Sequence, residues 1–232
     1  MNGGTRLLSR AISYAVEAAH DVTPALLPRP TPCRGWNLET LLMHASESLA
    51  ALRDGTVTGH IGLIPAAPDR DPAGDPVRIF RDRAGRLLAA RATTGGRHQV
   101  LDIGDLPLPA IAMECAGAIE IAVHGWDISQ ACGQRRPIPD TLAVGLLAIA
   151  PLLIPETGRR PLFGPPVRAT AQAGPGDLLV AFLGRKPPAA PLPPDHLGSA
   201  PAPSGRPATQ TPVHLTAARP PPSDDKLGAG LS

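Results

Sequence analysis

The stretch that decides the fold is residues 109–132, PAIAMECAGAIEIAVHGWDISQAC. It is apolar on nearly every side of a helical wheel, so it predicts one long helix over 109–131 that is buried on most faces. Within it, Glu120 and His124 lie one turn and about 40° apart. Burying an ionised carboxylate without a partner costs several kcal/mol. We therefore expect a cation, a hydrogen-bond network or a metal beside this helix.

The rest of the chain has helical periodicity too, and the pattern predicts an all-α fold. Apolar residues recur at helical spacing over 5–19, after the N-cap residue Asn37 and after Pro76. Residues 54–75 are rich in glycine and proline and predict a long loop, and residues 100–103 predict a short extended piece. Shorter helices are expected at 140–150 and 178–183. Four main helices with short additional ones indicate a four-helix bundle.

Composition bounds the domain organisation and the partners. The chain has 232 residues, of which 43% are hydrophobic and only 3% aromatic, and its net charge is +2. That balance disfavours nucleic-acid binding, which needs a concentrated basic surface. Twelve of the 30 prolines fall within residues 186–232. We expect a folded domain over 1–185 and a disordered Pro-rich tail, which either holds no site or offers a proline-rich ligand to a partner.

Targeting signals are not apparent in the sequence. The first 21 residues carry charge and lack an apolar signal core, and no window reaches the ~18 uninterrupted apolar residues of a membrane span. The three cysteines are odd in number and widely spaced, which is typical of reduced thiols. We therefore expect a cytoplasmic protein that does not associate with membranes, with a homodimer as an open option.

A candidate metal site follows from the distribution of histidines. Only His44 falls in the middle of a predicted helix other than 109–131, at the edge of its apolar arc. With Glu120 and His124 it would form a two-His, one-carboxylate set, and three protein ligands with open positions are typical of catalytic metals. The alternative is a buried Glu–His hydrogen-bonded pair without a metal.

Five ordered segments bear on this choice: TPCRGW (31–36), LLMHA (41–45), EIAVHGWDISQACG (120–133), RRPLFGPPV (159–167) and DLLVAFLGRKP (177–187). Together they resemble the DinB-like metal-binding superfamily, and within it the mycothiol-dependent maleylpyruvate isomerase N-terminal family and its single-domain relatives. The resemblance implies a four-helix bundle that binds a divalent metal, usually zinc, through His44, Glu120 and His124. Nickel, iron or manganese would suit the same ligands.

The resemblance also implies a function, for which three hypotheses remain open. The first is a metal-dependent transferase or isomerase that uses a thiol such as mycothiol on a small electrophilic substrate. The second is a thiol-independent hydrolase, lyase or cyclase, and the third is a non-catalytic metal-binding module. The maleylpyruvate isomerase itself has a further C-terminal domain, so we do not expect that particular reaction here.

Other residues near these segments have two possible roles each. Asp127 would orient the second ring nitrogen of His124 or accept a plain hydrogen bond at the helix end. Trp36 and Trp126 would line the pocket or belong to the core. Arg34 would contact an acidic substrate or be an exposed arginine. Cys33 is expected to be a packed thiol and not a nucleophile.

Overall fold

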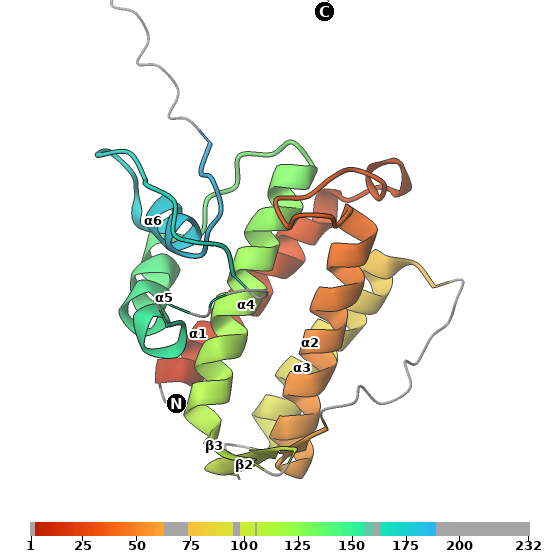
Figure 1. Cartoon of the computed structure of the whole chain (residues 1–232). Coiled ribbons are helices and arrows are strands. Elements are labelled where there is room, and N and C mark those ends of the chain that lie inside the picture. Colours follow the sequence, from red (N-terminus) through yellow and green to blue (C-terminus); the bar gives the residue numbers. More distant parts are fainter. Residues whose placement is uncertain are drawn as a thin grey trace, which may run out of the picture. The chain divides into compact units, whose positions relative to one another are not determined.

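The computed structural model describes residues 3–62, 74–94, 98–104, 106–155, 157, 159 and 163–188. Within these residues the chain is an all-α bundle with a small sheet at one end, which confirms the predicted fold class (Figure 1). None of the described helices is both long and apolar enough to cross a membrane. The tail predicted over residues 186–232 lies outside the described residues, apart from positions 186–188.

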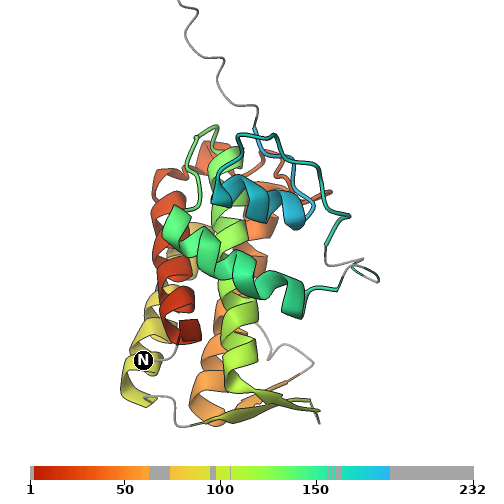
Figure 2. The same ribbon diagram turned by 90° about the vertical axis from the view of Figure 1, so that its left-hand side faces the viewer.

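Four long helices form the bundle. Helix α1 packs along α4, and α2 packs along α3; the contact of α2 with α4 joins these two pairs (Figures 1 and 2). The helices span α1 Gly3–Ala18, α2 Leu38–Thr58, α3 Pro76–Thr94 and α4 Ala110–Ala131. The bounds of α4 agree with the prediction from its sequence, and most of its second half is buried.

Side-chain caps fix where α2 and α3 begin. The side chain of Asn37 accepts a hydrogen bond from the backbone N–H of Thr40 at 2.8 Å, as expected for an N-cap residue. The carboxylate of Asp75 accepts from the N–H of Val77 at 3.0 Å, directly before Pro76. These contacts satisfy backbone donors that have no partner inside the helix.

The loop predicted over 54–75 is wrong at its start, because α2 continues to Thr58 and ends at Gly59 with φ +76°. Gly55 lies inside this last part of the helix and is buried. A Cβ there would come within 2.9 Å of the sulfur of Met113 and 3.0 Å of the side chain of Ile61, so a larger residue would require these side chains to shift. Packing against Met113 and Ile61 thus accompanies a glycine within a helix, where propensity alone predicts a break.

Two shorter helices pack on one side of the bundle (Figure 2). Helix α5 spans Asp140–Leu153 and α6 spans Pro175–Phe182, and both are longer than predicted. The prediction ended α5 before Pro151, but the helix carries this proline in its last turn, and the N–H of Ile154 still bonds to Ala150. In α6 the overlooked first turn begins at Pro175, a residue suited to that position.

A three-stranded sheet closes the end of the bundle between α2 and α4. Strand β2 (Val100–Ile103) pairs in parallel with β1 (His60–Ile61) and in antiparallel with β3 (Leu106–Pro109). The sequence predicted an extended piece only at β2. The other two strands have weak signals because one is two residues long and the other contains two prolines.

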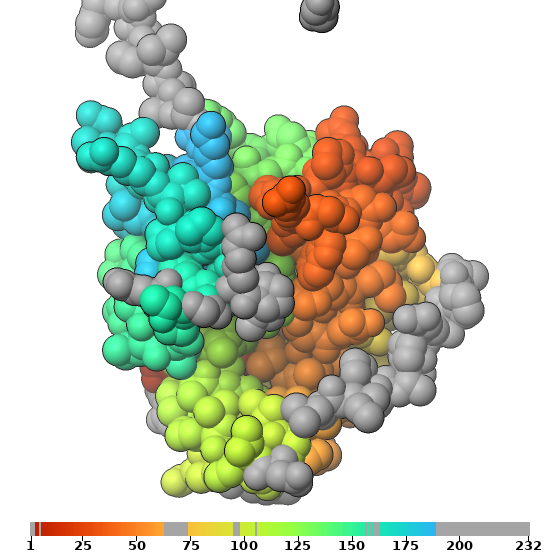
Figure 3. Space-filling view, viewed as in Figure 1, coloured from red at the N-terminus to blue at the C-terminus, as the bar shows by residue number. Residues whose placement is uncertain are grey.

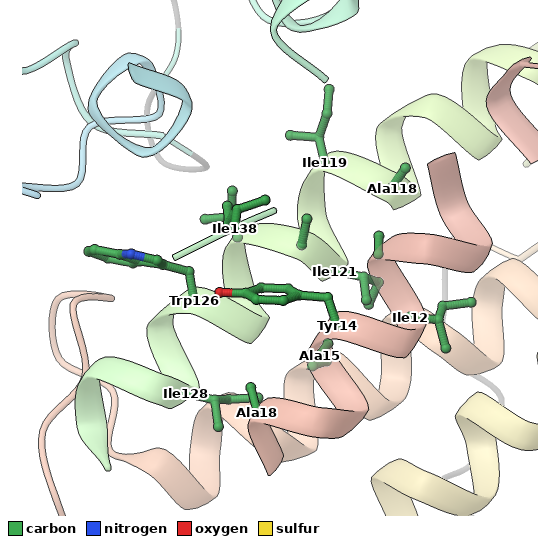
Figure 4. Packing of buried hydrophobic residues seen from close by; sticks show 14 of the residues in the cluster. Ile12, Tyr14, Ala15, Ala18, Ala118, Ile119, Ile121, Trp126, Ile128 and Ile138 are labelled. Atoms are coloured by element: carbon green, nitrogen blue, oxygen red, sulfur yellow. The ribbon is translucent and has the colours of Figure 1, made fainter. Parts of the chain in front are cut away.

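Helices α1 and α4 approach each other closely at Gly125 of α4. A Cβ at this position would lie 2.9 Å from the Cα of Ala15 and 3.0 Å from its Cβ. Figure 4 shows that side chains of α1 and α4 meet here, among them Tyr14, Ala15, Ala18 and Ile128. The small residues therefore allow the two backbones to approach, which sets the position of the second half of α4.

We predict that Gly125→Ala destabilises the protein by about 1–2 kcal/mol, because α1 must move and overpacking outweighs the gain in helix propensity. The matched control is Gly85→Ala on the exposed face of α3, where a Cβ would meet nothing within 4 Å. That control should stabilise the protein by up to about 1 kcal/mol. Urea unfolding measures both, and equal effects of the two substitutions would contradict the close approach.

Tyr14 gives a second check on the α1–α4 contact. Its hydroxyl donates a hydrogen bond to the carbonyl of Arg136 at 2.8 Å, and burial raises its pKa well above the usual 10.0. Tyr14 is the only tyrosine, so tyrosinate absorbance reports on it alone. We predict no ionisation at pH 10–11 until the chain unfolds. Because the folded state prefers the protonated form, the stability from this group is complete below pH ~10 and declines above it. Half-ionisation near pH 10 in a folded protein would contradict the burial.

Candidate metal centre

Helices α2 and α4 present the candidate residues to each other. His44 and Ser48 lie one turn apart on α2, and Glu120, His124 and Asp127 follow on α4. Because α2 and α4 pack against each other, the two sets of side chains meet across the helix interface. The i, i+4 spacing read from the sequence thus places polar groups in the inner face of the bundle.

The structure brings together the three side chains that the sequence singled out. Nε2 of His44 lies 3.1 Å from Oε1 of Glu120, and the imidazole rings of His44 and His124 have centroids 5.2 Å apart. One ligand atom from each of His44, Glu120 and His124 lies within 4.8 Å of the other two. The geometry suits a shared cation, and the contact of His44 with Glu120 also suits a hydrogen-bonded pair.

The cluster is open to a guest on one side. The side chains of His44 and Glu120 are 38% and 36% exposed, whereas that of His124 is 9% exposed. In the space-filling view of Figure 3, the orange residues of α2 and the cyan and blue residues of the C-terminal part border each other on the same face of the molecule. A small molecule therefore has access to two of the three candidate ligands.

Glu120 is held as a carboxylate. Burial raises its pKa. The hydrogen bond with His44, the nearby ring of His124 and the hydrogen bond from Ser48 lower it by more than burial raises it, so the pKa of Glu120 lies below the usual value. Oγ of Ser48 donates to Oε1 at 2.5 Å. An ionised carboxylate beside two imidazoles provides the charge and the donor atoms that a divalent cation requires.

A second polar cluster lies behind His124. Oδ2 of the fully buried Asp127 lies 3.2 Å from Nδ1 of His124 and accepts a hydrogen bond from the thiol of Cys33 at 3.2 Å. Nη2 of Arg185 donates to the same oxygen at 3.0 Å. Burial raises the pKa of Asp127, but His124 and Arg185 lower it by more, so its pKa lies below the usual value.

Cys33, His124 and Asp127 also have ligand atoms close enough to share a cation. Arg185 already places a guanidinium against both Asp127 and the sulfur of Cys33, at 3.0 and 3.4 Å. This permanent positive charge satisfies the second cluster. The set of His44, Glu120 and His124, which faces no arginine or lysine among the described residues, is thus the better candidate for a metal.

The Cys33 thiol is protonated in these surroundings. Burial, the first cause, and the charge of Asp127 raise its pKa to about 12, although Arg185 acts in the opposite direction. A thiolate is the reactive form of cysteine, so this residue is a poor nucleophile. Its geometry is that of a packed thiol that donates one hydrogen bond.

The remaining predicted residues separate into different places. The ring of Trp36 lies with its centroid 4.7 Å from that of His44 and 6.4 Å from that of His124, so it lies beside both imidazoles. Trp126 is 3% exposed and belongs to the core, as Figure 4 shows. Arg34 is exposed and has no hydrogen-bond or ion-pair partner among the described residues.

Two residues of the cluster were not expected from the sequence. Ser48 lies four residues after His44, so the same i, i+4 argument that linked Glu120 to His124 would have found it. Arg185 comes from beyond α6, and no local spacing connects it to Asp127. Only the tertiary fold brings Arg185 and Asp127 together.

The fold and the cluster define a helical bundle with a candidate metal centre between two of its helices. The family model of the mycothiol maleylpyruvate isomerase N-terminal domain matches residues 8–129, more than half of the chain. The chain therefore belongs to this family of DinB-like, metal-binding and mycothiol-associated proteins, which confirms the resemblance seen in the sequence. No curated protein and no solved structure matches the chain.

The state of Cys33 leads to a testable prediction. Because its pKa is about 12, we expect iodoacetamide at pH 8 to alkylate it at least about 50-fold more slowly in the folded protein than in urea. Mass spectrometry of the Cys33 peptide over time measures both rates. Equal rates in the two states would show that Cys33 is an accessible, reactive thiol.

Proposed function

We propose that this protein is a metal-dependent enzyme that uses a thiol, in this family mycothiol, to transform a small electrophilic substrate as a transferase or isomerase. In the proposal, His44, Glu120 and His124 hold a divalent ion, with zinc as the first candidate. The observation that carries it is the convergence of these three donors within 4.8 Å at a position open to solvent.

The donor set fits a divalent ion such as zinc. Two donors at about 2.1 Å from one tetrahedral ion lie roughly 3.4 Å apart, and the atoms of His44 and Glu120 are 3.1 Å apart. Three protein donors leave at least one coordination position free, which is the arrangement of catalytic sites. Asp127 contacts Nδ1 of His124, which leaves Nε2 as the nitrogen available to the ion.

Charge supports an external thiol as the guest. The two imidazoles are neutral as ligands and Glu120 carries one negative charge, so a divalent ion keeps an excess positive charge that favours an anionic guest. When bound, such an ion lowers the pKa of a coordinated thiol or water and polarises a substrate oxygen. The chain's own thiol at Cys33 is protonated and donates to Asp127. A second molecule must then supply the reactive sulfur.

The protein's residues would orient the reactants. Trp36 lies beside the two imidazoles and would give the site an apolar wall on one side. Ser48 and His44 hold Oε1 of Glu120 from α2, so this carboxylate keeps one orientation. Donor atoms held in one orientation and an apolar side chain next to them would help to position a thiol and a substrate for reaction with each other.

The test compares thiols on the zinc-loaded full chain. Monochlorobimane serves as the electrophile, and its fluorescent adduct is followed with mycothiol, with glutathione and without thiol. We predict the fastest turnover with mycothiol and a loss of more than about 100-fold in His44→Ala and in His124→Ala. His60→Ala, which changes an exposed histidine outside the cluster, is the matched control and should keep full activity.

Other outcomes would replace the proposal. Zinc-dependent turnover of an ester, epoxide or acid without any thiol would favour a hydrolase, lyase or cyclase. Tight zinc binding without thiol-dependent turnover, together with binding of a partner protein, would favour a non-catalytic module. Equal rates in the wild type and in the His44→Ala variant would contradict the site itself.

A further inference from the structure

Arg185 reaches the candidate metal centre from outside the part of the chain that the family model matches. It follows α6, and the matched residues end at 129. Its guanidinium donates through Nη2 to Oδ2 of Asp127 at 3.0 Å and through Nε to Oδ1 at 3.4 Å. Both carboxylate oxygens therefore face one planar fork, an arrangement that fixes direction as well as charge.

Asp127 needs this particular partner. Its side chain is 0% exposed, and an unpaired carboxylate at such a position costs several kcal/mol. The thiol of Cys33 is neutral, and a histidine that binds a metal through Nε2 is neutral too. Among the described residues, Arg185 is the only arginine or lysine within ion-pair distance of Asp127. Its charge is therefore what keeps a carboxylate behind a metal-binding His124.

The guanidinium itself is held in place by the end of α6. Nη1 of Arg185 donates to the carbonyl of Leu183 at 3.1 Å, and its backbone N–H donates to Val180 at 2.9 Å. Gly184 turns the chain with φ +82°, and a Cβ there would lie 2.8 Å from Gly164. The side chain is only 10% exposed. Its position is therefore set by the fold and not by solvent.

We propose that Arg185 is a positioning residue of the metal centre: it fixes the Asp127 carboxylate, which in turn fixes Nδ1 of His124 and directs Nε2 to the ion. This inference rests on the proposed metal site and adds to it the segment after α6. Arg185 touches neither His44 nor Glu120 among the described contacts. It also donates to Sγ of Cys33 at 3.4 Å, but Cys33 is a neutral thiol 3.9 Å from Nδ1 of His124, whereas the Asp127 carboxylate lies 3.2 Å from that nitrogen.

Zinc affinity tests the relay directly. The full chain is titrated with zinc against a chromophoric chelator, and circular dichroism confirms folding of each variant. We predict that Arg185→Gln weakens zinc binding about 10- to 100-fold, as is typical for groups that orient a ligating histidine. Arg185→Lys keeps the charge but loses the fork, so its loss should be smaller.

The matched control is Arg91→Gln. Arg91 is also a buried arginine, 7% exposed in its side chain, and it pairs with Glu114 of α4 at 2.9 Å. This variant should lose thermal stability yet bind zinc within about twofold of the wild type. The comparison separates positioning of His124 from a general effect of losing a buried ion pair.

A double variant distinguishes a relay from independent effects. If Arg185 acts through Asp127, the combination Arg185→Gln with Asp127→Asn should bind zinc no more weakly than Asp127→Asn alone. Additive losses would overturn the relay. So would Arg185→Gln if it folds and binds zinc within twofold of the wild type. Failure of the wild type to bind zinc would instead contradict the proposed function.

Discussion

Carboxylates set into an apolar helix are the constraint on which this structure depends. Asp127 is fully buried on α4, and Glu120 is about two-thirds buried on the same helix. Neither can remain ionised there without positive or hydrogen-bonding partners. Each recruits a different segment: Glu120 is met by His44 and Ser48 of α2, and Asp127 by Arg185 from beyond α6.

This division assigns different tasks to the two ends of one histidine. Nδ1 of His124 faces Asp127, which already has a permanent cation in Arg185. Its other nitrogen remains for the open cluster, where no arginine or lysine of the described residues supplies charge. A mobile divalent ion suits the open cluster, whereas a fixed guanidinium suits the closed one. The close packing of Gly125 on Ala15 holds the intervening part of α4 in place.

Much of this arrangement could be predicted from the sequence, because it is written in local spacing. The all-round apolar pattern defines α4, Asn37 marks the start of α2, and the i, i+4 pair of Glu120 and His124 points to a shared site. What could not be predicted depends on partners distant in the chain. Gly55 is helical although its type favours a break, and Arg185 meets Asp127 through the tertiary fold, 58 residues apart in the chain. The positions of the helices can be read from local sequence patterns, whereas the charged partners that support the site come from distant parts of the chain.

The most direct measurement of the central claim is a cobalt(II) titration of the metal-free full chain in a thiol-free buffer, followed by absorption spectroscopy. We predict one ion per chain and visible absorption bands typical of cobalt(II) with a low coordination number, without a thiolate-to-cobalt charge-transfer band. These visible bands should be lost in His44→Ala. The opposite pattern would be a charge-transfer band that survives His44→Ala and vanishes in Cys33→Ser. It would place the ion with Cys33 and Asp127 and contradict this account, as would the absence of any binding.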